Sequence, residues 1–326
     1  MKKIIISILI MLLLLFAGSQ ILTESNMILK SVVFSFNIWQ NNIFPSLFPF
    51  FVLSELLQYY GFIELVSELC KGLMQKFFKL KGECAFILIL SLISGFPSNA
   101  KYTKELYEKG LINEQEGTKI LTFTHFSNPL FILGTVSLLF LNNKEVGFLI
   151  LLCHYLGNFI IGLLFRNYYI SKPTYEKVSL KNAILKMHDK RLHQKENFGQ
   201  MITRALMNTI NTLLMILGIV TLFLVVTTII DHIMPLGTYH QSILNGFVEM
   251  TQGLKYVSIL EIPLKLKAVL SVMIISFGGL SVHMQIFSLL SDTKIKYLPF
   301  LTARILHAFI SSFLLYLLFD VWTYLL

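Results

Sequence analysis

The sequence has few charged residues and few cysteines for its length. Only 14% of its 326 residues are charged, while 55% are hydrophobic. So few charges cannot cover a soluble surface of that size, which excludes an ordinary soluble globular protein. A bilayer requires about 20 apolar residues per helix, so the chain has room for about eight membrane segments. We therefore expect an all-α polytopic membrane protein whose main partner is the lipid bilayer.

Metal-binding and catalytic motifs are also missing. Cys70, Cys84 and Cys153 lie far apart without a CxxC spacing, which argues against a disulfide framework, a metal site or a redox motif. The sequence contains no HExxH, no GxSxG and no pair of carboxylates at a workable spacing. It therefore predicts no catalytic residues, no bound metal and no cofactor, and we do not expect an enzyme. The cysteines are predicted to be packing residues.

Positive charge gathers in one segment of a chain whose net charge is +9. Between Arg166 and Arg204 there are nine Lys/Arg and three acids, so the segment carries 9 − 3 = +6. A positive loop between membrane helices is typical of the cytoplasmic side. The charges do not form a basic face with interleaved aromatic residues, as nucleic-acid binding would require. We predict a basic cytoplasmic loop over residues 167–204 and no nucleic-acid partner.

The N-terminus, MKKIIISILIMLLLLFAGSQ, predicts a membrane anchor over residues 1–26. Its apolar run over residues 4–22 is long for a signal peptide, and neither an A-x-A site nor a lipobox cysteine follows it. We favour a retained anchor helix, and a cleaved signal peptide stays the alternative. Lysines at positions 2 and 3 would lie on the cytoplasmic side.

Two glycine-containing breaks interrupt apolar runs. SGFPSNAK ends the run AFILILSLI after about ten apolar residues, roughly 15 Å of helix and half of a bilayer. The second run, AVLSVMIISFGGLSVHMQ, is broken at Gly278 and Gly279. Polar backbone at membrane depth is tolerated only where it is buried in protein or lines a water-filled cavity. We predict a re-entrant hairpin at each break.

Two landmarks recur at nearly one spacing. Gly95 and Gly278 are 183 positions apart, and His125 and His307 are 182 apart. We interpret residues 27–166 and 205–326 as two gate-like membrane repeats, each with a glycine-broken re-entrant hairpin. Counting spans from the cytoplasmic lysines inverts the second repeat relative to the first, as in many secondary transporters. If the broken segments cross the membrane fully, this topology changes.

The breaks supply the predicted substrate-binding residues. Backbone N–H groups freed near Ser98 and Asn99 would lie at a helix N-terminus, where an anion or a polar solute is favoured. In the alternative, the glycines only allow close helix packing and the serines bond to carbonyls. The predicted residues are Gly95, Pro97, Ser98, Asn99, Gly278, Gly279, Ser281, His283 and Gln285.

One basic pair lies inside a predicted span. Arg304 and His307 are three residues apart and share a helix face, and a charge there is expected to face the bundle interior or water. A partner carboxylate would be Glu249 or Glu55. In the alternative, Arg304 extends to the membrane interface.

Two further histidines, His125 and His154, lie singly on apolar segments. Neither has a second ligand three or four residues away, so we interpret both as satisfied core donors rather than metal ligands. The predicted ion or proton pathway comprises Glu55, His125, Asn128, Glu249, Arg304 and His307.

Several polar strings occur together in the order typical of one family. The chain resembles the YlbJ family of bacterial sporulation integral membrane proteins over roughly residues 30 to 320, in PSLFPFFVLSELL, SGFPSNAK, EQEGTKILTFTHFSNPLFILG, HYLGNFIIGLLFR, FGGLSVHMQ and TARILHAF. That family belongs to a wider group with a nucleoside-recognition or gate domain, which is similar to concentrative nucleoside transporters and spore maturation proteins. This sequence has Phe96 where tyrosine is familiar, and His125 before Ser127, Asn128 and Pro129.

The resemblance implies a role in building the spore cortex, in the mother-cell or forespore membrane. Two classes of function stay open. The first is a transporter-like protein that moves or binds a small polar solute, nucleoside-like or anionic, at the paired breaks. The second is a non-transporting membrane scaffold that recruits cortex-building sporulation proteins through the basic loop.

Overall fold

The computed structural model describes residues 2–172 and 178–325, so Glu176 and Lys177 of the predicted basic loop lie outside it. Every regular element in these residues is helical, which confirms the predicted all-α class. Before the basic loop come α1 (Lys2–Thr23), α2 (Ser25–Ile38), η1 (Trp39–Ile43), α3 (Phe44–Tyr59), α4 (Phe62–Leu73), η2 (Met74–Phe78), α5 (Cys84–Ser94), α6 (Ser98–Glu108), α7 (Glu114–Leu121), η3 (Phe131–Phe140), α8 (Lys144–Leu164) and η4 (Phe165–Asn167). After these come α9 (Leu180–Leu192), α10 (Phe198–Ile233), α11 (Thr238–Val248), α12 (Met250–Ser258), α13 (Leu264–Phe277), α14 (Gly279–Leu290) and α15 (Tyr297–Leu325).

Five helical segments of the described residues are long and apolar enough to cross a membrane. They are Ile4–Thr23, Lys144–Asn167, Phe198–Ile233, Leu264–Leu290 and Tyr297–Tyr324. A sixth candidate is the bent pair Ser25–Tyr59 and Phe62–Phe78, whose two parts meet at 88°. The right angle places α4 across the end of α3 rather than in line with it.

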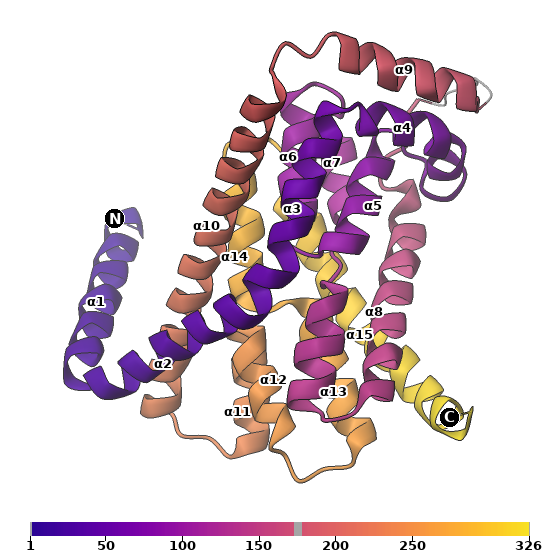
Figure 1. The fold of residues 1–326 in the computed structure, drawn as a ribbon. Helices are drawn as coiled ribbons and strands as arrows, with labels where there is room; N and C mark the ends of the chain where they lie inside the picture. The colour runs from indigo at the N-terminus through magenta and orange to yellow at the C-terminus, as the bar shows by residue number, and fades with distance from the viewer. Residues whose placement is uncertain (1, 173–177, 326) are drawn as a thin grey trace.

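The first hairpin lies where the sequence predicts it. Buried, apolar α5 enters the bundle and polar α6 returns toward the same side (Figure 1). The turn includes a cis peptide between Phe96 and Pro97 and a left-handed Gly95 with φ 77°. A Cβ atom on Gly95 would overlap the backbone of Asn128, so both the φ angle and the close approach require glycine.

A broken span follows this hairpin. α7 enters the bundle, residues 122–128 are non-helical, and η3 continues to the opposite side, from which α8 returns (Figure 1). α7 begins with a capping box, in which the Asn113 side chain accepts from the Glu116 N–H and the Glu116 side chain accepts from the Asn113 N–H. The break therefore separates two helices that enter the interior from opposite sides.

The second hairpin lies earlier than predicted. α11 and α12 form it on the side of the bundle opposite α5 and α6, with Glu249 in an extended conformation at the tip (Figure 1). α13 and α14 instead make up one candidate span, Leu264–Leu290. The prediction that Gly278 and Gly279 form the tip of a re-entrant hairpin is therefore wrong. Gly278 takes a left-handed φ of 93°, but α14 begins at the next residue, so the chain does not reverse.

The pairing of landmarks between the halves changes accordingly. Each half has a hairpin, a broken span and a long helix, in that order. By this order Gly95 corresponds to the region of Glu249, and the break that holds His125 corresponds to Gly278. The predicted pairs of Gly95 with Gly278 and of His125 with His307 are wrong, because His307 lies on the long helix α15. The inverted relationship between the halves stays a prediction.

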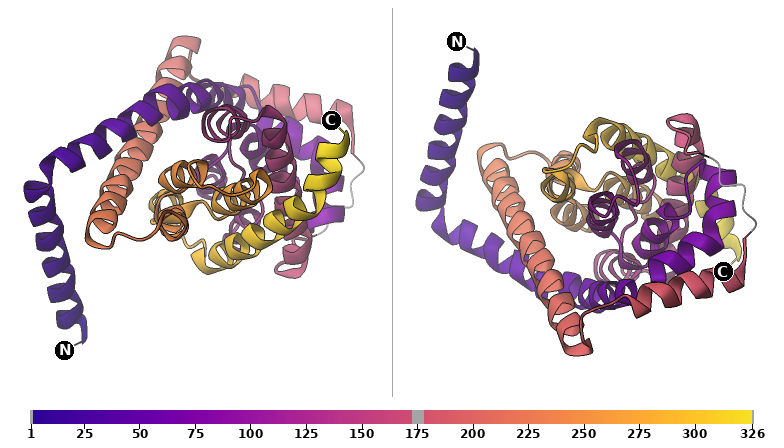
Figure 2. Two further views of the ribbon diagram at one scale, coloured as in Figure 1. Left: turned by 90° about the horizontal axis from the view of Figure 1, so that it is seen from below. Right: turned by 90° about the horizontal axis from the view of Figure 1, so that it is seen from above.

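Two helices lie outside this bundle. α1 stands apart and packs against α2, and its apolar window is entirely unburied (Figures 1 and 2). A helix that is apolar all round and covered by nothing suits an anchor surrounded by lipid. α9 lies across one end of the molecule and packs on α4, within the predicted basic loop. α10 begins at Phe198, also within the range predicted as loop.

Candidate functional site

A pocket lies where the two hairpin tips meet the two broken spans. Its cavity volume is about 40 Å³, which is room for a few water molecules. Its walls combine Phe96 from the first tip, Asn128 from the first break, Glu249 from the second tip and Gln285 from α14. The other lining residues are Ile43, Ser46, Leu47, Ser127, Phe131, Ile216, Val220, Met250, Thr251 and Val282.

Asn128 fixes the first tip to the first break. Its Nδ2 donates to the Ser94 carbonyl at the end of α5, at 3.0 Å, and to the Ser46 carbonyl of α3, at 3.3 Å. Its Oδ1 accepts from the backbone N–H of Leu130 at 2.8 Å. The main chain adds a bond from the Phe96 N–H to the Phe126 carbonyl at 2.7 Å. The unwound backbone is thus largely satisfied by protein, as an irregular segment at membrane depth requires.

Glu249 holds the second tip in the same way. The carboxylate is 1% exposed and caps α12 by accepting from the Gln252 N–H at 2.8 Å. Thr251 Oγ1 donates to it at 3.1 Å and Ser281 Oγ at 3.5 Å. These are neutral donors, and no lysine or arginine among the described residues forms an ion pair with it. The pocket therefore carries a buried carboxyl group without a cationic partner.

Arg304 is fully buried on the other side of the first break, at 0% exposure. Its Nη1 donates to His307 Nδ1 at 2.9 Å, both Nη atoms lie 3.2 Å from Asn158 Oδ1, and Nη2 donates to the Thr122 carbonyl. Burial rules out the alternative in which Arg304 extends to the interface. The predicted partners Glu249 and Glu55 are wrong, because neither carboxylate contacts the guanidinium.

The histidines around this arginine differ in how they are satisfied. His154 Nε2 accepts from the Ser127 N–H and its Nδ1 donates to Ser276 Oγ, both at 2.9 Å, so the prediction of a satisfied core donor is confirmed. For His125 that prediction is wrong. Both of its ring nitrogens are buried without a hydrogen-bond partner. Its ring is held by aromatic contacts instead, stacked on Phe96 at 4.7 Å and edge-on to Phe300 at 5.2 Å.

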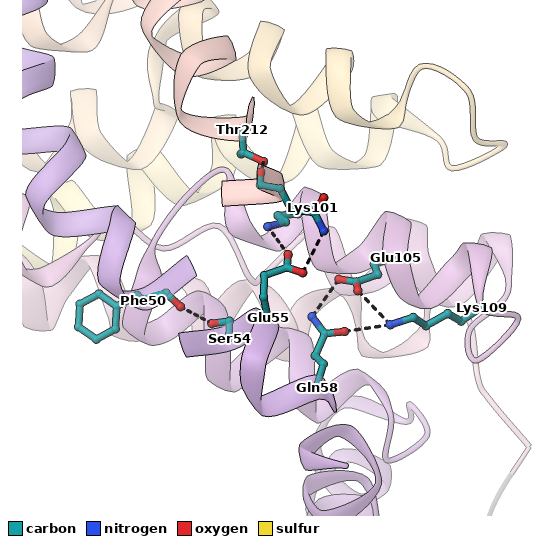
Figure 3. Close-up of polar contacts among 9 residues, drawn as sticks. Phe50, Ser54, Glu55, Gln58, Lys101, Glu105, Lys109 and Thr212 are labelled. Carbon is teal, nitrogen blue, oxygen red and sulfur yellow. Dashed lines mark hydrogen bonds and ion pairs between the residues drawn. The ribbon is translucent and has the colours of Figure 1, made fainter. Parts of the chain in front are cut away.

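Glu55 lies away from the pocket, in the contact between α3 and α6 (Figure 3). Lys101 Nζ is 2.5 Å from one carboxylate oxygen, and Asn208 Nδ2 of α10 donates to the other at 3.2 Å. One turn further along, bonds of 2.9 to 3.0 Å link Gln58, Glu105 and Lys109. We call these six residues the first latch, because they fasten the outgoing arm of the first hairpin to α3 and α10.

A second latch fastens the other hairpin to α10. Asp231 accepts from Asn245 Nδ2 at 3.0 Å, from the Tyr256 hydroxyl at 2.9 Å and from Gln241 Nε2. These donors lie on α11 and α12 and are uncharged. The two latches thus differ in chemistry, since lysines take part only in the first.

Of the predicted substrate-binding residues, Gln285 lines the pocket, and of the predicted pathway, Asn128 and Glu249 do. Gly279 packs against the Met250 backbone of the second tip, and Gly278 faces the His125 ring. These glycines therefore bring the tips and breaks together without lining the pocket.

The remaining predicted residues lie behind the pocket. Ser98 Oγ donates to the Gly95 carbonyl, and both side-chain polar atoms of Asn99 are buried without a partner. His283 Nε2 lies 3.0 Å from the Phe277 carbonyl, and its Nδ1 lies 2.6 Å from the Tyr297 hydroxyl.

Sequence reasoning missed several contributors. The pocket is also lined by Phe96, Ser46, Ser127 and Thr251. Two of these could have been found from the sequence, because Ser127 precedes Asn128 and Thr251 stands two positions after Glu249. Asn158 could also have been found from the sequence, because it stands four residues after His154 and so shares the helix face of that histidine.

Lys119 is a further buried cation that the sequence did not single out. Its ammonium donates to the carbonyls of Phe78 at 2.5 Å, Arg166 at 2.7 Å and Tyr169 at 2.5 Å. It ties the end of η2 to η4 and to the residues that follow η4. Within the described residues, no group of three or more His, Cys, Asp or Glu side chains is placed to hold a metal ion.

These features define a multi-pass membrane protein with two broken spans and, between opposed hairpins, a largely apolar pocket that holds a few polar side chains. A family model named Gate, described as nucleoside recognition, matches residues 42–144. The sporulation integral membrane protein YlbJ of Bacillus subtilis (strain 168) is 34% identical over 294 residues, covering 83% of this chain and 72% of the relative. The chain therefore belongs to the YlbJ family of sporulation integral membrane proteins. No solved structure matches it.

Proposed function

We propose that this protein moves or binds a small polar solute in a membrane of the sporulating cell, and that it does so without catalysing a reaction. The observation that supports this most is the pocket between the hairpin tips, with Glu249, Asn128 and Gln285 in its walls. Polar groups converging in a largely apolar pocket are typical of a solute site. The match to a nucleoside-recognition family makes nucleosides the first solutes to test.

The chemistry of the pocket favours a solute rich in hydrogen-bond donors. Glu249 offers carboxylate oxygens, and the amide of Gln285 offers both a donor and an acceptor. A buried acceptor without a cation gains from a ligand N–H or O–H that replaces lost water contacts. Among the residues that line the pocket there is no lysine or arginine to pair with an anionic solute. We therefore propose a neutral or cationic solute, so that a nucleoside-like solute is favoured over an anionic one.

The test uses purified protein reconstituted in lipid vesicles, with a panel of nucleosides as probes. We expect saturable uptake or binding that Gln285→Leu weakens by about tenfold or more, since an amide hydrogen bond to a ligand is worth roughly 1.5 kcal/mol or more when lost inside a pocket. Gln115→Leu is the matched control, because Gln115 is exposed on α7. Equal binding by both variants would show that the pocket does not carry the function.

The role in sporulation is tested separately in a spore-forming host that lacks the corresponding gene. We propose that the protein is needed for the spore cortex, so wild-type protein should restore heat-resistant spores and Gln285→Leu should restore fewer. Full rescue by a variant with bulky residues at both Gln285 and Thr251 would count against any solute role in sporulation.

A second candidate function is a scaffold that recruits sporulation proteins. It is favoured by α9, which presents Leu180, Ile184, Leu185 and Leu192 at 46 to 69% exposure on the basic loop. An exposed apolar stripe rimmed by lysines suits a protein partner. Replacing Ile184 and Leu185 with Ser should abolish sporulation while leaving vesicle binding intact if the scaffold role is the main one.

A further inference from the structure

Among the half-helices that end inside the bundle in the described residues, α5, α7 and α13 share one feature at their C-terminal ends. Each end is closed by a side-chain N–H group of the protein. Asn128 Nδ2 donates to the Ser94 carbonyl of α5, and His283 Nε2 donates to the Phe277 carbonyl of α13. The end of α7, at the C-cap residue Thr122, receives Arg304 Nη2.

The end of α7 differs from the other two because its partner is permanently charged. The C-terminal end of a helix carries a partial negative charge of about half an electron. In membrane transporters, the carbonyl ends of half-helices are positions where a mobile monovalent cation is coordinated. A guanidinium at this position supplies the same positive charge from the protein itself.

The surroundings of Arg304 support a cation held by oxygen atoms rather than by an acid. The guanidinium is 0% exposed. Asn158 Oδ1 lies 3.2 Å from both Nη atoms, while Asn158 Nδ2 donates to the His125 carbonyl at 2.8 Å, which fixes the amide with its oxygen toward the arginine. No carboxylate among the described residues pairs with this charge. Carbonyl and amide oxygens are the ligands that hard cations prefer.

From this geometry we infer that Arg304 is a built-in cation, which occupies at the end of α7 the place of a mobile Na⁺ or K⁺ ion. The protein therefore requires no dissociable cation there, and its stability is independent of which monovalent cation is in solution. This inference concerns the broken span alone. It holds whatever solute the pocket takes.

The test measures the melting temperature of the purified protein in detergent, in NaCl, KCl and choline chloride at equal ionic strength. The wild-type protein is expected to melt at the same temperature in all three salts. Arg304→Ser removes the charge, adds a hydroxyl and leaves room beside the Thr122 and Asn158 oxygens. Its melting temperature should fall in choline chloride and rise again, saturably, with Na⁺ or K⁺.

Three variants complete the design. Arg304→Lys keeps a cation and should remain insensitive to the choice of salt. Arg304→Met fills the space without charge and should melt early in every salt. Arg166→Ser is the matched control, because Arg166 Nη2 donates to the Lys76 carbonyl at 2.9 Å in an exposed position, where water replaces it.

A saturable Na⁺ or K⁺ effect on the wild-type protein overturns the inference, as does an Arg304→Ser variant that responds to salts like the wild type. If Arg304→Ser does not fold, the other two variants decide. Lysine tolerated and methionine not tolerated supports a built-in cation, whereas methionine tolerated as well as lysine overturns it. No solute is used in these measurements, so failure of the proposed function would leave their outcome unchanged.

Discussion

Glu55 and Lys101 form an ion pair that is nearly closed to solvent, with side-chain exposures of 6% and 12%. Removing one partner leaves an uncompensated charge, which typically costs about 3–5 kcal/mol, while removing both costs much less. We therefore predict that Glu55→Gln and Lys101→Met each destabilise strongly and that the double variant is more stable than the sum of the two effects implies. The measurement is a double-mutant cycle on the free energy of unfolding in detergent.

The pair Lys265 and Asp320 is the control for that cycle. Its nitrogen and oxygen are 2.6 Å apart, but Asp320 is 74% exposed. Solvent-exposed pairs contribute about 0–1 kcal/mol. Coupling energies of similar size at both pairs would contradict a buried first latch.

At the residue scale, the sequence indicated which side chains matter better than it indicated their partners. Charge inside an apolar span singles out Arg304, and Glu249 enters as its candidate partner carboxylate. The sequence predicts a carboxylate as the partner of Arg304, but its acceptors are a main-chain carbonyl, the His307 ring and the Asn158 amide. Main-chain acceptors occur at every position, so the sequence contains no signal for them.

Among the elements, the first hairpin depends on one glycine. Gly95 has a left-handed φ of 77°, and a Cβ there would overlap the Asn128 backbone. We predict that Gly95→Ala lowers the free energy of unfolding by about 1–3 kcal/mol, since it combines strain with a displaced tip. Thermal unfolding in detergent measures this.

Gly218 on α10 is the matched control, because its position has no neighbouring atom within 4 Å and an ordinary φ. Gly218→Ala should leave stability unchanged or raise it by roughly 0.5–1 kcal/mol. A destabilisation equal to that of Gly95→Ala would show that the tip is not specifically strained.

The docking of α9 on α4 should depend on pH through Glu68. Burial raises the pKa of this carboxyl, but hydrogen bonds from Lys186 of α9 and from Lys71 outweigh burial and hold the pKa below its ordinary value. A carboxyl with a lowered pKa contributes stability that is present above its ordinary pKa and lost as pH falls through the lower folded value. We predict that α9 loosens in that acidic range.

Amide hydrogen exchange over Leu180–Leu192 measures this loosening. Glu68→Gln should give fast exchange already at neutral pH, with little further change on acidification. The quantity compared is the protection of each amide relative to an unfolded peptide at the same pH. High protection that does not change with pH in the wild-type protein would be inconsistent with Glu68 holding the helix.

Elements with strong composition signals were predictable, and those with weak signals were not. The proline, glycine and small polar residues of SGFPSNAK ended an apolar run and marked the first tip. The second tip is formed by NGFVEMTQGLK, where the turn is made by one extended residue, Glu249, and no proline marks it. Gly278 was misinterpreted because a left-handed glycine ends a helix without determining the direction of the next one.

On the scale of the whole molecule, the basic loop predicts the orientation in the membrane. α9 and the second hairpin lie at opposite ends of the bundle (Figure 1). In a Cys70→Ser background, His188→Cys on α9 should react with an impermeant maleimide only from the cytoplasmic side, and Tyr239→Cys on α11 only from the outside. Cys84 and Cys153 are fully buried and should stay unlabelled. Labelling of both positions from one side would contradict the proposed topology, and labelling from the exchanged sides would reverse it.

The class of the molecule followed from composition, because the hydrocarbon core of a membrane dictates long apolar helices. The apolar length of α1 was likewise readable from the sequence, whereas the cytoplasmic side of the basic segment stays a prediction from charge. The packing of the two halves could not be predicted from the sequence. The contacts of Gly95 with Asn128 and of Gly279 with the second tip join segments that no local sequence pattern relates.

One consequence of the latches concerns motion. Both are attached to α10, through Asn208 at one end and Asp231 at the other, which are about 35 Å apart at 1.5 Å per residue. A continuous helix of 36 residues transmits a tilt along its whole length. We expect a tilt of α10 to move one hairpin away from the pocket and the other one toward it. The pocket would then open to one side of the membrane at a time.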